Sequence, residues 1–592
     1  MVTYAERPWL KHYDAGVPHS LEPYPDKVLH DYAREAAQNF PHKPALVTTS
    51  KVPGLGRQTA TVTHGELDRL SDALAAGLID VGLKKGDRVA IILPNVTAFA
   101  ISYYGVLKAG GVVVATNPTY PPPKMQFQIN DCDAEIVITL SLFYNVVKQI
   151  QPQTKVRTVI VTNIKEYFAP VAKFLFTLAM EKKRGHRIEK LHPGDHWFQD
   201  VLARYAGQKP DVKVMPDDLA LFQYTGGTTG VSKGAMATHR ALVANLLQSR
   251  AWTGGDAFKD IDRSELIYLG AIPLFHSYGL IVMLNQATAT GARIVLIPNA
   301  RDTDEVVDVI HHYRPNIFLG VPALFNAVNN HPRVKSGEVR LDCFIFCSSG
   351  AAPLPQATKR EFEGLSGAVI TEGFGMSEAP TASISNPISG ENRPGSVGLP
   401  FPDMDMRIVS LDDGETEVPV GEIGELVMAG PQLMVGYHGM PTETANVLRE
   451  KDGKMWLYTG DIARMDEDGY FYIVDRKKDM ALIGGFNVYP SNIEKVLKEH
   501  PAVLEVGVAA IPHPERAGEE TLKAWIVLQP GQSVTEQELI AHCSKFLGGY
   551  EVPRRFAFVP ELPKSAVGKT LRRELIQMEM AEQEKAASAQ AV

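Results

Sequence analysis

Cysteine is scarce in this sequence. The 592 residues include only four cysteines, which are too few and too widely spaced for a disulfide-stapled domain or a CxxC metal site. Free thiols in a reducing cytosol are the simplest interpretation, so we expect a cytoplasmic protein without a zinc site. The four are Cys132, Cys343, Cys347 and Cys543.

A secretory signal and clean membrane-spanning runs are missing as well. Residues 1–16 are charged and have no apolar core. Two uncharged runs, 89–107 and 266–292, reach the length of a membrane span. Prolines interrupt them at Pro94 and Pro273, so we expect both runs to fold as buried strands and helices.

Positive charge is not in excess. The formal net charge is −8 and the pI is near 6.1, which argues against a general attraction to nucleic acid. HExxH does not occur, so the sequence offers no zinc-protease helix. Apolar residues make up 45% and charged residues 22%, as in globular proteins, and the length predicts about three or four folding units.

What the sequence does contain is a loop at 223–234, QYTGGTTGVSKG, that suits a phosphate. Glycines let backbone N–H groups converge on an anion, threonine hydroxyls donate or reach a metal, and Lys233 supplies charge. The flanks predict a strand at 219–222 and a helix capped by Thr238. It is not a Walker A loop, because Lys233 comes three residues after Gly230, and a flexible surface loop is the alternative.

The loop resembles the phosphate loop of the adenylate-forming superfamily, which includes acyl-CoA synthetases, luciferases and peptide-synthetase adenylation domains. The TGGTTG form is most like the long-chain fatty acyl-CoA synthetases, although many members carry Ser and Pro in place of Gly227 and Ser232. An early KAGG element at 108–111 also fits the resemblance. The resemblance implies that ATP contacts Thr225, Gly226, Gly227, Thr228, Thr229, Gly230 and Lys233.

Two later segments, 344–353 and 369–378, each read as a strand followed by small residues. They resemble the adenine-binding elements of the superfamily, in which Phe374 stacks on the base and Glu378 holds Mg²⁺ together with Thr225. The alternatives are that Phe374 is an aromatic residue of the core and that Glu378 is a solvated carboxylate in a turn. The AMP-binding residues implied here are Gly350, Ala351, Ala352, Glu372, Gly373, Phe374, Gly375 and Met376.

His276 follows a buried strand and a proline. A lone histidine in apolar company is usually a satisfied core residue. The position resembles the superfamily's aromatic/His element, so we expect His276 to help place the substrate carboxylate.

From residue 398 onward, short alternating strands with Asp/Gly turns predict a small antiparallel subdomain. Within and after it, the resemblance implies ribose contacts from Asp461 and Arg476, a hinge at Lys478, a CoA contact from Gly484 and Gly485, and a catalytic Lys569.

The expected fold class is α/β. A large N-terminal domain, 1–477, has αβ layers with parallel sheets plus the antiparallel subdomain, and a small mobile α+β domain follows at 478–592. Residues 578–592 are rich in Ala, Glu and Gln, which predicts a frayed helix or a disordered tail.

The resemblance implies an ATP-dependent ligase that activates a fatty acid to acyl-AMP, releases pyrophosphate and passes the acyl group to CoA, with Mg²⁺. Three alternatives stay open: a fatty acyl-AMP ligase that loads a carrier protein, an adenylating enzyme for another carboxylate, and a catalytically silent acyl- or nucleotide-binding scaffold. We expect only small-molecule substrates and no nucleic acid, and leave a homodimer open.

The segment 167–187 combines an apolar stripe with a basic cluster. An amphipathic helix packed on its own domain is the first interpretation. The alternative is peripheral association with the inner face of the membrane. The stripe is Phe168, Val171, Phe174, Leu175 and Leu178, and the cluster is Lys182, Lys183, Arg184 and Arg187.

Overall fold

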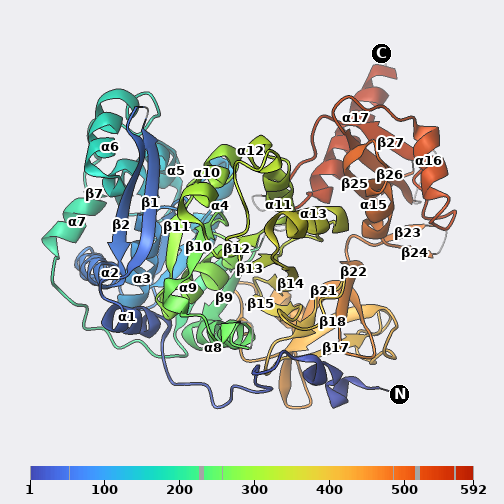
Figure 1. Cartoon of the computed structure of the whole chain (residues 1–592), viewed down its shortest axis with the longest axis horizontal. Coiled ribbons are helices and arrows are strands. Elements are labelled where there is room, and N and C mark those ends of the chain that lie inside the picture. The colour runs from blue at the N-terminus through green and yellow to red at the C-terminus, as the bar shows by residue number, and fades with distance from the viewer. Residues whose placement is uncertain are drawn as a thin grey trace.

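The structure is a computed structural model that describes residues 2–52, 54–225, 232–255, 258–483, 486–513, 520–565 and 568–590. Figure 1 shows a large layered body, an antiparallel subdomain beneath it and a small C-terminal unit to one side. The expected α/β architecture is therefore confirmed.

One large sheet carries the strand ends that surround the site. Within the described ranges it has nine strands, parallel from β14 through β1 and antiparallel at both edges. In spatial order they are β16 (Leu399–Pro400), β15 (Ala379–Ser385), β14 (Ile370–Met376), β13 (Phe346–Ser349), β12 (Ile317–Gly320), β10 (Ile267–Gly270), β11 (Arg293–Leu296), β1 (Pro44–Val52) and β2 (Gly56–Thr63).

A second large sheet holds the strand before the phosphate loop. It has eight strands in the described part of the chain, parallel from β8 through β7. They are β19 (Gly436–Tyr437), β9 (Gly234–Thr238), β8 (Leu219–Tyr224), β4 (Val112–Ala115), β3 (Arg88–Ile92), β5 (Ile136–Leu140), β6 (Thr158–Thr162) and β7 (His196–Trp197).

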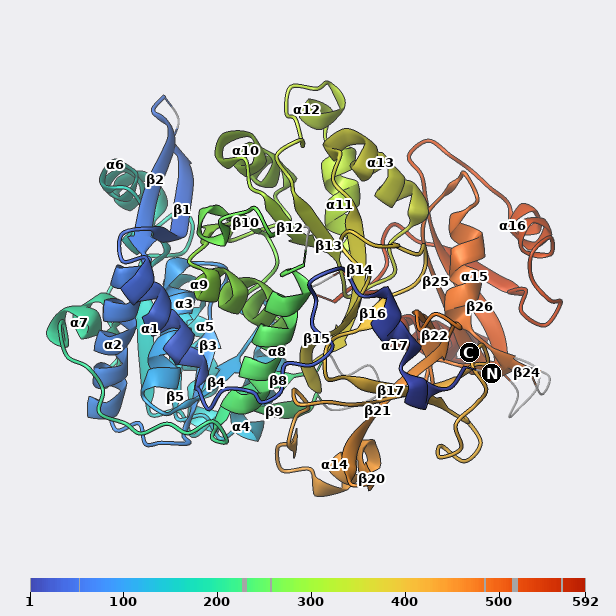
Figure 2. The same ribbon diagram turned by 60° about the horizontal axis from the view of Figure 1, so that its bottom comes forward.

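Helices pack between and around these sheets (Figure 2). They are α1 (Leu29–Asn39), α2 (His64–Asp80), α3 (Thr97–Lys108), α4 (Pro122–Asp131), α5 (Tyr144–Ile150), α6 (Pro170–Leu175), α7 (Phe198–Arg204), α8 (His239–Trp252), α9 (Gln286–Thr290), α10 (Thr303–Tyr313), α11 (Pro322–Asn329), α12 (Pro332–Lys335) and α13 (Gln356–Ser366). The run 89–107 thus forms β3 and α3, and 266–292 forms β10, a π-helix (Tyr278–Asn285) and α9. Within the described ranges, no helix is both long and apolar enough to cross a bilayer.

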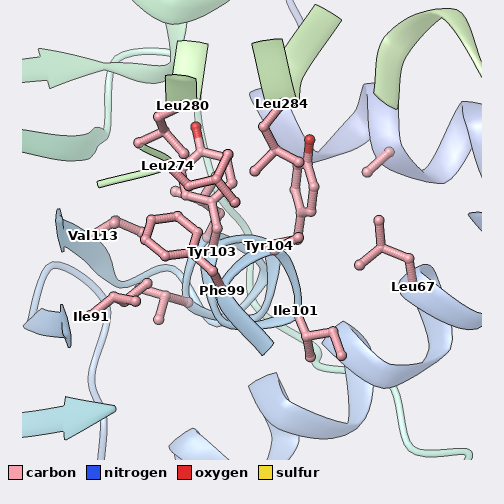
Figure 3. Close-up of a cluster of buried hydrophobic side chains, with 14 of the residues drawn as sticks. Leu67, Ile91, Phe99, Ile101, Tyr103, Tyr104, Val113, Leu274, Leu280 and Leu284 are labelled. Carbon is pink, nitrogen blue, oxygen red and sulfur yellow. The ribbon is translucent and has the colours of Figure 1, made fainter. Parts of the chain in front are cut away.

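The core between the two sheets centres on α3, all of whose residues are buried. Figure 3 shows Phe99, Tyr103 and Tyr104 of α3 beside Leu280 and Leu284 of the π-helix. Large aromatic side chains bury much apolar area and pack with defined geometry. The π-helix that begins at Tyr278, next to the predicted site residue His276, is therefore held on a rigid layer.

The antiparallel subdomain and the C-terminal unit complete the fold. The subdomain contains β17 (Asp405–Val409), β18 (Gly424–Ala429), α14 (Pro441–Val447), β20 (Leu448–Lys451), β21 (Lys454–Met465) and β22 (Phe471–Arg476). The C-terminal unit contains β23 (Ala481–Ile483), β24 (Phe486–Val488), α15 (Pro490–Lys498), β25 (Val503–Pro512), β26 (Glu520–Leu528), α16 (Glu536–Cys543), β27 (Arg555–Phe558) and α17 (Arg572–Gln590). Within the segment expected to be a frayed helix or tail, α17 runs to residue 590.

Candidate active site

A pocket of about 730 Å³ lies where the large sheet, the antiparallel subdomain and the C-terminal unit meet. We call it the central pocket. Its volume is that of a typical ligand site, and it lies at the carboxyl ends of parallel strands β12 and β13. The predicted residues that line it are Thr225, Lys233, His276, Gly350, Ala351, Gly373, Phe374, Gly375, Met376, Glu378, Arg476, Lys478 and Lys569.

The phosphate loop leaves β8 but does not lead directly into a helix. Strand β9 intervenes and pairs with β8 in antiparallel fashion, so the predicted strand, loop and helix order is corrected to a hairpin followed by α8. At the base of this hairpin the Thr225 N–H donates to the Lys233 carbonyl at 2.9 Å. Thr238 caps α8 as predicted, because its side chain accepts from the Ala241 N–H at 3.2 Å. The predicted loop residues Gly226, Gly227, Thr228, Thr229 and Gly230 lie outside the described residues.

Lys233 brings a cation to the pocket wall. Its ammonium pairs with Glu443 of α14 and lies 5.1 Å from the ring centre of Tyr437. Neither partner was found from the sequence. Tyr437 lies in β19, which has only two residues and so shows no periodic pattern, and Glu443 lies in α14, about 200 residues after the loop. Anionic phosphates would compete with the Glu443 carboxylate for this lysine.

Two glycines of the set predicted to bind adenine, Gly350 and Gly375, serve different purposes. A Cβ on Gly350 would approach no protein atom closer than 3.5 Å, which leaves its backbone open to a ligand. A Cβ on Gly375 would lie 1.5 Å from the Thr381 carbonyl oxygen, so this glycine is required by the β14–β15 pairing. The side chain of Phe374 lies on the pocket wall, within reach of a base.

Two residues of the predicted adenine set do not line the central pocket, namely Ala352 and Glu372. Glu372 lies in the interior, where its Oε2 accepts from the Leu354 N–H at 3.3 Å. Burial raises the pKa of the Glu372 carboxyl. Glu372 therefore lies behind the pocket wall in this structure.

Glu378 presents a carboxylate to the pocket. Tyr437 donates its hydroxyl hydrogen to Oε1 of Glu378 at 2.8 Å, and burial raises the Glu378 pKa. No cluster of three His, Cys, Asp or Glu side chains that could hold a metal occurs in the described part of the chain. One carboxylate with a nearby threonine suits Mg²⁺, which is usually held by one or two carboxylates plus substrate phosphates.

Asp461 and Arg476 form an ion pair at the subdomain side of the pocket. Arg476 Nε lies 2.9 Å from Asp461 Oδ1, and the Asp461 side chain is only 2% exposed. Asp461 itself lies behind the pocket wall, and burial raises its pKa. Its Oδ2 has no hydrogen-bond partner among the described residues. A buried, unpaired carboxylate oxygen is costly, so a hydroxyl donor that reached it would be strongly favoured.

Two lysines line the pocket, one at the predicted hinge and one in the C-terminal unit. Burial, with the nearby Arg476 charge, lowers the pKa of Lys569 to about 8 and that of Lys478 to about 8. The Lys569 backbone is anchored through Ser565, whose Oγ accepts from the Lys569 N–H at 3.1 Å. No described residue hydrogen-bonds or ion-pairs with the Lys569 ammonium. The predicted CoA residues Gly484 and Gly485 lie outside the described residues.

His276 lies on the pocket wall as a neutral imidazole. Burial lowers its pKa to about 4, so it carries no charge near neutral pH. Its Nδ1 accepts from the Tyr278 N–H at 3.3 Å, which leaves the ring proton on Nε2. The ring can therefore donate a hydrogen bond to an anion in the pocket.

The sequence matches two family descriptions, "AMP-binding enzyme" over residues 33–438 and "AMP-binding enzyme C-terminal domain" over residues 492–569. It is 38% identical to a long-chain-fatty-acid–CoA ligase of Bacillus subtilis, over 97% of this chain and 98% of the relative. It is 37% identical to a long-chain-fatty-acid–CoA ligase of Escherichia coli, over 96% of this chain and 97% of the relative.

The fold also matches solved structures over nearly the whole chain. The crystal structure of ATP-bound MatB from Rhodopseudomonas palustris has a TM-score of 0.76 and 27% identity, covering 92% of this chain and 98% of that one. A fatty acyl CoA synthetase of Mycobacterium tuberculosis has a TM-score of 0.68 and 25% identity, covering 94% and 99%. Sequence and fold agree over nearly the whole length, and the protein belongs to the AMP-binding enzyme family.

Proposed function

We propose that the protein is an ATP-dependent ligase that activates a long-chain fatty acid to acyl-AMP and transfers the acyl group to CoA. One observation carries the proposal: the central pocket gathers Lys233, Glu378, Arg476 and Lys569 from the phosphate loop, the large sheet, the subdomain and the C-terminal unit. The relatives that match over the full length and are named long-chain-fatty-acid–CoA ligase supply the substrate class.

In the first half-reaction a carboxylate oxygen attacks the α-phosphorus of ATP, and pyrophosphate leaves. The difficulty is to bring two anions together and to stabilise charge that develops on the phosphates. Lys569 and Lys233 supply positive charge, and neutral His276 donates from Nε2 to the acyl carboxylate. Glu378 and Thr225 would hold Mg²⁺, which would neutralise phosphate charge.

In the second half-reaction the CoA sulfur attacks the acyl carbonyl, the bond to AMP breaks, and the thiol proton is lost. No protein nucleophile is needed. We propose that the C-terminal unit turns about Lys478 between the two steps, withdrawing Lys569 and presenting residues 484–485 to the pantetheine arm.

The substrate assignment predicts a ranking of carboxylates. With CoA present, dodecanoate to octadecanoate should give a higher kcat/KM in a pyrophosphate-release assay than acetate or an aromatic acid. The same assay without CoA separates the alternatives. A CoA ligase should release about one pyrophosphate per enzyme and stall, whereas faster turnover with a carrier protein than with CoA would favour an acyl-AMP ligase. A preference for acetate or an aromatic acid would reject the long-chain assignment.

We also propose that the protein docks peripherally on anionic membranes through the α6 patch, which comprises Val171, Phe174, Leu175, Leu178, Lys182, Lys183 and Arg184. Apart from Phe168, the residues of the stripe are exposed in this structure: Phe174 is 63% exposed and Leu178 is 70% exposed. Figures 1 and 2 both place α6 at the end of the molecule away from the C-terminal unit. Lys182, Lys183 and Arg184 are exposed and form no ion pair with a described residue, so their charge is available to lipid headgroups.

The docking proposal predicts salt-sensitive flotation with anionic liposomes. Replacing Lys182, Lys183 and Arg184 with alanine should weaken binding, because each basic residue near an anionic surface contributes about 1 kcal/mol. The matched control is Lys495→Ala with Lys498→Ala, two exposed lysines on α15, which should leave flotation unchanged. No flotation of the parent protein, or equal loss in both variants, would reject the α6 patch.

A further inference from the structure

Arg572 joins the C-terminal unit to the large domain. It is the first residue of α17 and follows Lys569 by three positions. Its guanidinium lies 3.0 Å from Asp475 Oδ1 and 3.1 Å from Asp479 Oδ2. On its other edge it donates to Ser491 Oγ at 2.7 Å and lies 3.0 Å from Glu494 Oε2. The Arg572 side chain is only 14% exposed, so these are shielded, charge-assisted contacts.

Its partners lie on opposite sides of Lys478. Asp475 belongs to β22 and precedes the proposed hinge, whereas Asp479, Ser491 and Glu494 follow it. Asp475 is 1% exposed, and its second oxygen accepts from the Ser491 N–H at 2.8 Å. Asp475 is therefore the point at which the large domain holds the C-terminal unit beside the hinge.

The connection from Arg572 to Lys569 is short and braced. The Leu571 N–H donates to the Pro563 carbonyl at 2.9 Å, and Lys564 and Thr570 form a β-bridge. Because Thr570 and Leu571 are held in this way between Lys569 and Arg572, we expect a shift of the guanidinium to displace the Lys569 ammonium. A misplacement of about 1 Å is enough to affect a reaction that depends on alignment.

We propose that Arg572 is a positioning residue. Its ion pair with Asp475, which we call the clasp, holds Lys569 in the central pocket during acyl-AMP formation. The clasp opens when the C-terminal unit turns for the thioester step. This inference rests on the proposed function and on the proposed rotation about Lys478. The alternative is a purely structural role, in which Arg572 only stabilises the C-terminal unit through Glu494 and Ser491.

The test compares the two half-reactions in Asp475→Asn and Arg572→Gln. Both variants should slow single-turnover acyl-AMP formation by about tenfold or more, since a charge-assisted contact is lost. Both should convert synthetic acyl-AMP and CoA to acyl-CoA at the parent rate or faster, because the clasp is open in that step. Arg572→Lys, which keeps the charge, should recover part of the first rate.

The control is Glu579→Gln on the same helix, which weakens the ion pairs of the buried Glu579 with Lys523 and Arg555 away from the hinge. It should lower the Tm without changing the ratio of the two half-reaction rates. If Asp475→Asn leaves that ratio unchanged, or if Arg572→Gln damages both steps equally, the clasp is rejected. A parent enzyme that forms no acyl-AMP would instead reject the proposed function.

Discussion

Replacing Lys569 with alanine should slow acyl-AMP formation by about 10²- to 10³-fold, because one preorganised donor to the reacting anions is lost. The Lys569 ammonium lies in the central pocket and forms no ion pair with a described residue, so it is free to meet the acyl carboxylate and the α-phosphate. The thioester step should be nearly unaffected, since the proposed rotation about Lys478 would by then have carried residue 569 away. Supplying synthetic acyl-AMP with CoA, beside ATP with fatty acid, measures the two steps separately.

Equal slowing of both steps by Lys569→Ala would contradict the proposed rotation. If neither step is slowed, Lys569 has no role in the reaction and is only a charge on the protein. The melting temperature checks for lost stability. We expect little change, because the Lys569 ammonium has no hydrogen-bonded partner among the described residues whose loss would destabilise the fold.

The pH dependence of the first half-reaction tests the role of Lys569 independently. With a Lys569 pKa of about 8, the ammonium is protonated below that pH and is lost as the pH rises through it. The kcat/KM of the first half-reaction, which reports the free enzyme, should therefore fall above about pH 8. Lys569→Arg should shift that fall to higher pH. Lys478→Arg, at a lysine with a similar pKa, should leave it in place.

Asp461→Ala should weaken ATP binding by roughly 10- to 150-fold, the effect of losing a hydrogen bond to a charged group. Asp461 Oδ2 is buried and has no hydrogen-bond partner among the described residues, so the carboxylate can accept from a ribose hydroxyl that reaches it. If so, 2′-deoxy-ATP or 3′-deoxy-ATP should bind the parent more weakly than ATP does, and the variant should not distinguish them. Titration calorimetry with each nucleotide measures the difference.

Asp466→Ala is the matched control for Asp461. Asp466 is also an acidic residue of the subdomain, but it pairs with Arg393 at 2.8 Å outside the pocket. This control should lower stability and keep the parent's preference for ATP over the deoxynucleotides. An undiminished preference in Asp461→Ala would show that the carboxylate does not contact the ribose.

The layered fold was predictable from the sequence because its signals are local. Apolar runs such as 89–93 and the helix cap Thr238 mark strands and helices without reference to the rest of the chain, and the structure bears them out. Strand β9 was missed because its five residues lie between a glycine-rich loop and the helix cap, where they read as part of the loop. Its identity comes from pairing with β8 and β19, which is a tertiary property.

The site was predictable only in part, for a related reason. Residue types suited to phosphate and metal could be read along the chain, and most of them do line one pocket. Glu443 and Tyr437 were missed because they act on Lys233 and Glu378 from a distant segment. The exposure of Phe174 and Leu178 was likewise hidden, because an apolar stripe looks the same whether or not another element covers it.

The central claim is that a fatty-acid carboxylate oxygen attacks the α-phosphorus of ATP in this pocket. The most direct measurement uses palmitate labelled with oxygen-18 in its carboxylate, with ATP, Mg²⁺ and CoA, followed by mass spectrometry of the nucleotide product. The account predicts that each AMP released carries one labelled oxygen, since the bond between the acyl carbon and the bridging oxygen is the one that the thiol breaks. Unlabelled AMP, or ADP in place of AMP, would contradict it.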